Sequence, residues 1–135
     1  MKLITKINKL EKELTELKKQ VQKKDYEPVV CNGLMWSEIT DDEMDWEEAM
    51  EYAMDLREGG YKDWRLPTIS ELQNVFDYKK GKPKIDFMDI SYFWSSIEYS
   101  VDATYAWYVN LYHGHTYHYL KTNSYAVRCV REDKG

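Results

Sequence analysis

The sequence predicts an α+β domain preceded by a coiled-coil helix. Apolar residues recur at heptad spacing over residues 1–25, and signals for a hairpin and two helices follow between residues 29 and 80. The rest of the chain consists of short aromatic-rich stretches separated by polar turns, as is typical of strands. Because strands and helices are segregated along the chain, the pattern favours α+β over an alternating α/β sheet.

The first 25 residues carry the apolar stripe of a coiled coil. Its members follow one another at intervals of four, three, four, three and four residues, which is the a/d period of a heptad. The mixture of Ile, Val and Leu suits two or three strands, and we expect a homo-oligomer, with a trimer favoured. The alternative is a single amphipathic helix packed on its own domain. The stripe consists of Leu3, Ile7, Leu10, Leu14, Leu17 and Val21.

The globular domain is expected to span residues 26–135. Pro28 cannot continue the helix, and it biases the residue before it away from helical conformation. Directly after it, Val29-Val30-Cys31 and Leu34-Met35-Trp36 flank Asn32-Gly33. An Asn-Gly pair between two apolar runs is the strongest short-range signal for a hairpin, so the domain is expected to open with two paired strands.

Two helix starts are marked by capping boxes. Asp45 with Glu48, and Thr68 with Glu71, place an acceptor side chain before a helix and a carboxylate three residues later. Gly59-Gly60 is expected to end the first helix. The faces expected to be buried are Trp46, Ala49, Met50, Ala53 and Leu56 in the first helix, and Ile69, Leu72, Val75 and Phe76 in the second.

Four stretches after residue 80 are expected to form strands. The tryptophans in and before them are expected to be scaffold, because each buries a large apolar area where strands are short. The stretches are 93–94, 106–111, 116–119 and 125–130, and the scaffold residues are Trp36, Trp64, Trp94 and Trp107.

The net charge changes sign at residue 25, where the heptad pattern of apolar residues also ends. Residues 1–25 hold eight basic and four acidic residues, and residues 26–135 hold eleven basic and twenty acidic ones, a net charge of −9. An acidic domain repels phosphate, so we expect no nucleic acid among the partners. The chain has no run of about 20 apolar residues and no signal-peptide pattern, so we expect no membrane insertion.

No catalytic constellation can be read from the sequence, so we expect a non-catalytic protein without a cofactor. An enzyme needs a nucleophile with a base, a carboxylate pair in a pocket, or a metal cluster. His113 and His115 on a strand would point to one face and share a metal only if further ligands were near. No adjacent Cys or carboxylate completes such a site, so no metal is expected.

A set of motifs in fixed order covers residues 29–132. The motifs are Gly33-Leu34-Met35-Trp36, Gly60-Tyr61-Lys62-Asp63-Trp64-Arg65-Leu66-Pro67-Thr68, Glu71-Leu72, Phe93-Trp94-Ser95-Ser96, Ala106-Trp107-Tyr108-Val109-Asn110 and Val127-Arg128-Cys129-Val130-Arg131. In these motifs the chain resembles the C-terminal domain family of the bacterial collagen-like adhesins. The resemblance implies a C-type-lectin fold, related to the formylglycine-generating-enzyme domain, although only Cys129 lies in the C-terminal half, where that enzyme needs a pair of cysteines.

The chain departs from relatives of this fold in two places. Family members often carry a Cys in the first helix that can bridge to the last strand, and Ala53 stands there in this chain. The fold implies neighbouring first and last strands, which leaves Cys31 as the partner available to Cys129, either bridged or free. Calcium-dependent lectins of this fold use a Glu-Pro-Asn-type loop and a Trp-Asn-Asp strand, and neither occurs here.

Tyr and His residues are concentrated near the C-terminus. Seven of the twelve Tyr residues and all three His lie between residues 99 and 125. Tyr gives rigid contact area and a hydroxyl, and His, Ser and Asn give adaptable hydrogen bonds, which is the composition of binding loops. Tyr108 and Tyr125 are expected on a half-buried sheet. The candidate contact residues are Tyr99, Asp102, Tyr105, Tyr112, His113, His115, Tyr117, His118 and Tyr119.

The same residue types arise when the adenines of adenine-adenine-pyrimidine codons are randomised. The chain thereby resembles the variable proteins of diversity-generating retroelements, which use a C-type-lectin fold and vary near the C-terminus. The resemblance implies a receptor-binding or display protein of a virus or microbe, located on the virion or cell surface, that recognises a protein or glycan ligand on a cell surface. The alternative is a fixed adhesin domain that binds a glycan or polyanion.

Overall fold

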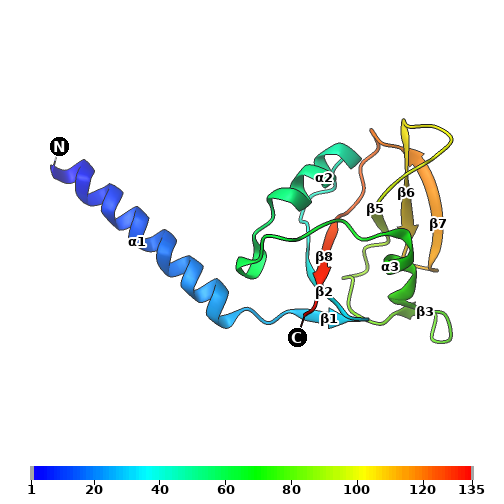
Figure 1. Ribbon diagram of the computed structural model, residues 1–135, viewed down its shortest axis with the longest axis horizontal. Coiled ribbons are helices and arrows are strands. Elements are labelled where there is room, and N and C mark those ends of the chain that lie inside the picture. Colours follow the sequence, from blue (N-terminus) through cyan, green and yellow to red (C-terminus); the bar gives the residue numbers. More distant parts are fainter. Residues whose placement is uncertain (1, 135) are drawn as a thin grey trace.

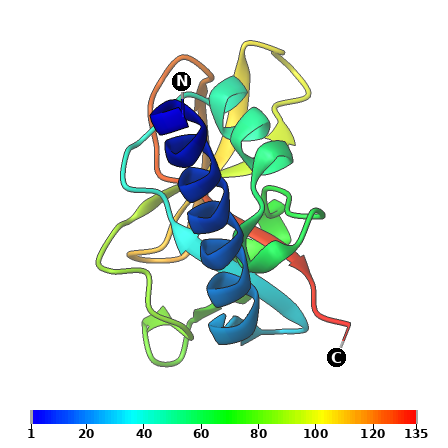
Figure 2. The ribbon, with the colours of Figure 1, turned by 90° about the vertical axis from the view of Figure 1, so that its left-hand side faces the viewer.

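The computed structural model describes residues 2–134, and it describes the side chains of residues 3–17 and 26–134. The chain begins with one long helix, α1 (Lys2–Asp25), which projects away from the rest of the molecule (Figures 1 and 2). The stripe residues from Leu3 to Leu17 are all exposed, so these residues do not pack on the chain's own domain. The side chain of Val21 lies outside the described residues. No helix in the described part of the chain is long and apolar enough to cross a membrane.

The first and last strands of the domain lie in one antiparallel sheet. It consists of β1 (Val29–Cys31), β2 (Leu34–Ile39) and β8 (Arg128–Glu132), in the order β1-β2-β8. Asn32 and Gly33 both have positive φ, 56° and 76°, as a type I′ hairpin turn requires, so the expected hairpin is confirmed. The pairing of β2 with β8 joins the two ends of the domain, as a C-type-lectin fold implies.

Both expected capping boxes are formed. α2 (Trp46–Asp55) begins after Asp45, and α3 (Ile69–Asn74) begins after Thr68. The expected stop at Gly59-Gly60 is wrong by one turn, because α2 already ends at Asp55 and the glycines form a separate 3₁₀ turn, η1 (Glu58–Gly60). The helices and the separate strands confirm the α+β class.

A second antiparallel sheet lies at the end of the domain that is remote from α1 (Figure 1). It consists of β5 (Tyr92–Glu98), β6 (Tyr105–Asn110) and β7 (His115–Leu120), in that order. The hairpin of β3 (Phe76–Asp77) and β4 (Lys82–Pro83) was not expected from the sequence. The expected strand over residues 125–130 begins only at Arg128. The two residues after Ser124 instead make single bridges, Tyr125 to Met44 and Ala126 to Phe93.

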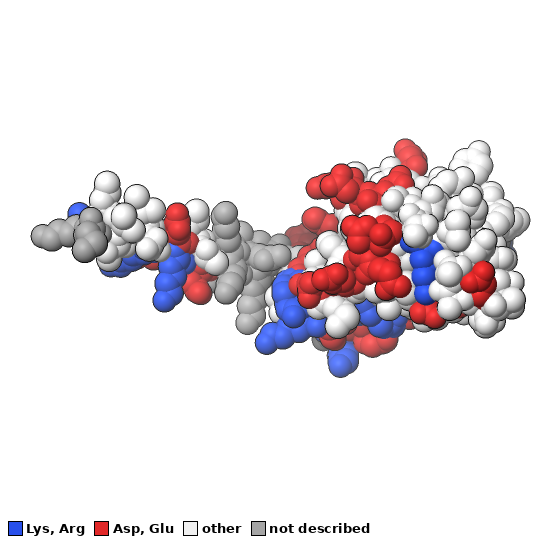
Figure 3. All heavy atoms as spheres, turned by 90° about the horizontal axis from the view of Figure 1, so that it is seen from above, with Lys and Arg blue, Asp and Glu red and all other residues white. Residues whose placement is uncertain are grey.

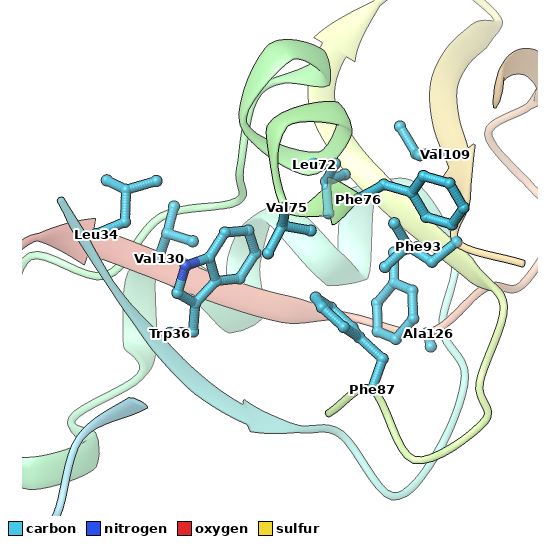
Figure 4. Packing of buried hydrophobic residues seen from close by; sticks show 11 residues of the cluster. Leu34, Trp36, Leu72, Val75, Phe76, Phe87, Phe93, Val109, Ala126 and Val130 are labelled. Atoms are coloured by element: carbon cyan, nitrogen blue, oxygen red, sulfur yellow. The ribbon is translucent and has the colours of Figure 1, made fainter. Parts of the chain in front are cut away.

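The core consists of two clusters, one of which is shown in Figure 4. Trp36 and Phe93 belong to the first cluster, and Trp64 and Trp94 belong to the second. All four are buried, as expected for the tryptophans, but Trp107 is only half-buried. Trp107 stands on the sheet face that also carries His118, directly opposite it, and its scaffold assignment is therefore wrong in part.

Each buried indole donates a hydrogen bond to a main-chain carbonyl of another segment. Burying an indole N–H without an acceptor costs about 1–3 kcal/mol, so each indole fixes the segment that supplies its acceptor. The bonds are Trp36 to Cys31 (3.3 Å), Trp46 to Ser95 (2.8 Å), Trp64 to Glu58 (3.0 Å) and Trp94 to Met44 (2.9 Å).

Two buried arginines attach β8 to its surroundings. The guanidinium of Arg128 donates to the carbonyls of Ser37 (2.6 Å) and Asp86 (2.8 Å), and burial lowers its pKa. The guanidinium of Arg131 donates to the Asp63 carboxylate (2.6 Å) and lies 3.7 Å from the centre of the Tyr61 ring. The last strand is therefore held by side-chain hydrogen bonds as well as by its pairing with β2.

The two cysteines are free. β2 lies between β1 and β8, so it separates Cys31 from Cys129 by two strand spacings. Burial raises the pKa of the Cys129 thiol to about 12, which keeps it protonated and unreactive.

The junction between α1 and the domain is tightly built around Gly59. Gly59 has a φ of 63°, and a Cβ placed on it would lie 2.4 Å from Cδ1 of Tyr26. The Tyr26 hydroxyl donates to the Glu58 carboxylate (2.5 Å), which also accepts the main-chain N–H of Glu38 (3.1 Å). Tyr26 therefore fixes the point at which the chain enters the domain.

We predict that Gly59→Ala destabilises the domain more than Gly81→Ala does. Both glycines have positive φ, so each substitution carries a conformational cost of about 1–2 kcal/mol. At Gly81 nothing lies within 4 Å of an added Cβ, whereas at Gly59 the new methyl meets the Tyr26 ring. Urea unfolding of the two variants measures the difference, and equal losses would contradict the close packing at the junction.

A second prediction concerns the Arg65–Glu71 pair. Arg65 donates two hydrogen bonds to the Glu71 carboxylate (2.7 and 2.8 Å), and chiefly for this reason the pKa of Glu71 lies below its ordinary value. A lowered folded-state pKa gives stability that is present above the unfolded-state pKa, roughly 4.3, and is lost as the pH falls through the folded-state value. We expect Glu71→Gln to show a smaller loss of unfolding free energy between about pH 5 and pH 3 than the unchanged chain. Parallel pH curves from urea unfolding would show that the pair does not contribute.

Candidate ligand-binding surface

Most of the candidate contact residues lie on the second sheet and its loops, at the end of the molecule remote from α1. We call the outward side chains of β5, β6, β7 and the loops 99–104 and 111–114 the distal surface. Glu98 is the only charged residue of the three strands, and it pairs with Lys121 (3.3 Å). Figure 3 shows acidic atoms gathered over the middle of the domain and few charged atoms at its distal end. The distal surface is therefore an aromatic, nearly uncharged part of an acidic domain.

One face of the sheet carries a row of tyrosines. Tyr108 on β6 lies opposite Tyr117 on β7, and their rings stack with centres 5.6 Å apart. Tyr92 on β5 lies 5.7 Å from Tyr108, and Tyr125 lies 4.3 Å from Tyr108 beneath them. Tyr92 and Tyr117 are 46% and 40% exposed, whereas Tyr125 is buried. The row therefore presents two accessible rings that are supported from below.

Tyr108, which supports the two accessible rings, is uncharged. Burial, together with a hydrogen bond to Tyr125, raises the pKa of Tyr108 well above its usual range. The phenol of Tyr108 therefore remains protonated at physiological pH. Tyr108 and Tyr125 occupy the half-buried and buried positions expected of them.

The other face of the same strands carries a second aromatic group. His118 on β7 stacks on Tyr99, with ring centres 3.9 Å apart and planes inclined by 5°. Trp107 lies opposite His118 with its edge toward the imidazole (4.9 Å), and Tyr105 lies 5.9 Å away. These contacts hold the loop that starts at Tyr99 against the sheet. The aromatic group therefore stabilises the loop and is also partly exposed to solvent.

The turn between β6 and β7 is organised by Asn110. Its Oδ1 accepts the main-chain N–H of Tyr112 (2.9 Å), and its Nδ2 lies 3.1 Å from Nε2 of His113. His113 lies in this turn and not on a strand with His115, yet the two imidazole centres are only 4.4 Å apart. The described residues include no group of three or more His, Cys, Asp or Glu side chains that could hold a metal ion.

None of the nine candidate residues is buried. The exposed ones are Asp102, Tyr112, His115, Tyr117, His118 and Tyr119, and the half-buried ones are Tyr99, Tyr105 and His113. The carboxylate of Asp102 accepts hydrogen bonds from the N–H (2.9 Å) and hydroxyl (2.6 Å) of Thr104, which lower its pKa. Asp102 therefore shapes its own turn as well as facing solvent.

Tyr92 belongs to the same surface but was missed by the sequence reasoning. It directly precedes the buried pair Phe93-Trp94, so its position at the start of a strand gave the impression of scaffold. Alternation along the strand could not reveal its exposure, because Tyr92 and Trp94 share a face of the sheet and Trp94 is completely buried.

An open groove of about 990 Å³ adjoins the distal surface. Lys80, Lys82 and Lys84 line one side of it, and Tyr112, 79% exposed, lies at its edge. Among the described residues, none of these lysines forms an ion pair. Asp77, Asp86 and Asp89 line the same groove, so its three lysines are matched by three carboxylates. The sequence analysis did not identify this groove.

Comparison with known proteins places the chain in a family. No curated protein sequence matches it. Among solved structures it is similar to EMS16, an antagonist of the collagen receptor integrin alpha2beta1, with 15% identity, a TM-score of 0.49, and coverage of 76% of this chain and 94% of the EMS16 chain. Residues 30–131 match the Lcl C-terminal domain, which is the family that the motifs indicated. The chain therefore belongs to the Lcl C-terminal domain family.

Proposed function

We propose that the chain is a non-catalytic ligand-binding protein of a virion or cell surface, which recognises a protein or glycan ligand on another cell through its distal surface. The observation that carries the proposal is the solvent exposure of Tyr and His side chains on a sheet that buried residues support. Its membership of the Lcl C-terminal domain family supports a binding role. Rigid aromatic rings with hydroxyl groups give contact area at a low cost in side-chain entropy.

The division between support and surface also favours the finer part of the proposal. Phe93, Trp94, Ala106 and Val109 are completely buried, while most side chains of the neighbouring strand β7 are exposed. Side chains on β7 can therefore change without leaving cavities in the core. A variable protein of a diversity-generating retroelement needs this property, and a neighbouring reverse transcriptase gene with a near-repeat template is the genetic observation that would test it.

Oligomerisation through α1 is the second part of the proposal. The described stripe side chains are exposed over four turns of helix, and a homo-oligomeric coil, with a trimer favoured, would bury them. The distal surface lies at the far end of the molecule from α1, so a coil would leave it free (Figure 1). Several weak sites on one particle then act together, because later contacts become intramolecular.

The groove supports a second candidate function, that of a fixed adhesin domain binding a glycan. The groove is lined by three lysines and by three aspartates, Asp77, Asp86 and Asp89, so it offers both hydrogen-bond donors and acceptors to the hydroxyl groups of a glycan and has no excess positive charge for a polyanion. Under this function, binding depends on groove residues such as Lys80, Lys82 and Lys84. Under the first function it depends on the aromatic rings of β7 and the preceding turn.

We predict that alanine at Tyr112, His115, Tyr117 or Tyr119 lowers the free energy of unfolding by at most about 1 kcal/mol, because each side chain is exposed, with the largest loss at Tyr117, which stacks on Tyr108. Phe93→Ala is the buried control and is expected to cost about 3–5 kcal/mol. Circular dichroism with thermal melting checks both. A collapse of stability in the exposed series would place these residues in the core and remove the proposed surface.

The same variants, tested for binding to intact cells and to a glycan array, locate the site. The aromatic series is expected to lose binding by about tenfold or more, as removal of a contact worth about 1.4 kcal/mol does. A Lys80→Ala/Lys82→Ala/Lys84→Ala variant is the matched control and is expected to bind normally. Loss in the lysine variant with retention in the aromatic series would favour the fixed adhesin.

A further prediction concerns avidity. Ile7→Gln with Leu14→Gln is expected to abolish the oligomers that form through α1 and to weaken binding to a ligand-dense cell surface by about 100-fold, while binding at a single site stays unchanged. Lys9→Gln with Lys12→Gln, which changes the same helix outside the stripe, is the control. Light scattering gives the mass of each variant. Unchanged surface binding by a proven monomer would rule out the avidity argument.

A further inference from the structure

β7 is an edge strand whose outer side has no partner. The second sheet has the order β5-β6-β7, and no described element lies beyond β7 in Figure 1. The six residue pairs between β6 and β7 follow one another without a bulge. An edge of this kind presents unpaired N–H and C=O groups in a straight row.

The register identifies which groups are unpaired. The N–H of Lys121 donates to the Thr104 carbonyl, so this pair is of the hydrogen-bonded kind. Hydrogen-bonded and non-hydrogen-bonded pairs alternate along an antiparallel ladder, so Tyr119 and Tyr117 also bond to β6. The residues that alternate with these two along β7 are Thr116, His118 and Leu120, and their main-chain N–H and C=O groups therefore point away from β6. Of these, only the Leu120 carbonyl has a partner outside the strands, the N–H of Asn123 (3.0 Å).

The edge also lacks the features that usually prevent pairing. Natural edge strands carry lysine or other charged residues, proline or a bulge, or they are covered by another element. β7 has the sequence His-Thr-Tyr-His-Tyr-Leu, with no charged residue and no proline, and it is exposed at five of its six positions. The strand is thus open and unprotected, except at the Leu120 carbonyl, which accepts the main-chain N–H of Asn123.

The charge distribution favours a second copy of this chain as the occupant. The domain has a net charge of −9, so two copies repel each other over most of their surfaces. The distal end has few charges (Figure 3), and two copies meet there with the least repulsion. β7 is also remote from α1, so contact between two such ends leaves the helices free (Figure 1).

We propose that two copies pair along β7 in antiparallel register centred on His118. In this register His118 of each copy exchanges main-chain hydrogen bonds with its equivalent, and Thr116 does so with Leu120 of the other copy. Tyr117 then lies opposite Tyr119 on both sides of the centre, and cross-strand aromatic pairs of this kind are favourable. The two sheets become one continuous six-stranded sheet.

The pairing covers part of the distal surface and therefore competes with ligand. Tyr117, His118 and Tyr119 lie at the centre of the paired strands and also belong to the candidate contact residues. In the paired molecule each of these side chains remains on a face of the joined sheet, beside a cross-strand neighbour from the second copy that covers part of its contact area. This inference goes beyond the proposed function and does not depend on the identity of the ligand.

The test uses the full chain and variants of the outer ladder. His118→Pro removes the central outward N–H, which edge strands tolerate because it makes no bond to β6. His118→Ala removes the same imidazole but keeps the N–H, and it is the matched control. Leu120→Lys leaves the main chain intact and places a positive charge at each end of the pairing, so it serves as a second, independent variant. Circular dichroism establishes that each variant is folded.

Analytical ultracentrifugation from micromolar to millimolar concentration gives the first result. The unchanged chain and His118→Ala are expected to double in mass with concentration, starting from whatever oligomer α1 forms. His118→Pro and Leu120→Lys are expected to shift the half-association concentration upward by at least tenfold. No doubling of the unchanged chain at millimolar concentration, or doubling that persists in both variants, overturns the proposal.

Amide hydrogen exchange measured by NMR tests the mode of pairing. In dilute protein, the amides of Thr116, His118 and Leu120 are expected to exchange faster than those of Tyr117 and Tyr119. At high concentration the three outward amides are expected to become protected, while the other two stay unchanged. Doubling without this protection, or protection that arises only when a different protein is added, overturns a second copy as the occupant.

Discussion

The fold depends on the requirement that every buried indole N–H find an acceptor. The strands of this domain are short, and much of the chain between them is irregular, so regular pairing alone cannot fix the loops. Four tryptophans supply both the apolar area and the connection, because each ring fills the core and each N–H binds a main-chain carbonyl elsewhere. The acceptors belong to the β1 end, the segment before α2, η1 and β5, namely Cys31, Met44, Glu58 and Ser95.

Indole hydrogen bonds also fix the sheet that carries the candidate surface. Trp46 binds the carbonyl of Ser95 on β5, and Trp94 on β5 binds the carbonyl of Met44, so the two rings tie β5 to the start of α2 in both directions. β6 is then held by its pairing with β5, and β7 by its pairing with β6, by contacts with α3 and by the stacking of His118 on Tyr99. β7 is nevertheless the outermost strand of this sheet, and five of its six side chains are exposed.

Features encoded by neighbouring residues were predictable from the sequence. The Asn32-Gly33 turn and the capping boxes at Asp45 and Thr68 each depend on residues within a few positions, and all three are present. The α+β class followed from the order of such signals. The β3–β4 hairpin and the groove beside it were not predictable, because the hairpin consists of two residues per strand and the groove is completed by Leu111 and Tyr112, which meet residues 77–91 only in the folded chain.

Trp107 shows why the candidate site was harder to define than the fold. A tryptophan within a strand motif is ordinarily core, yet the position of its strand in the sheet decides which face is covered. Trp107 lies opposite His118 of the edge strand and so receives a neighbour on only part of its ring. The same circumstance leaves Tyr117 and His118, which point to opposite faces of β7, both exposed. A strand at the edge of the sheet thus presents both faces and its main chain to a partner, which no strand in the middle of a sheet can do.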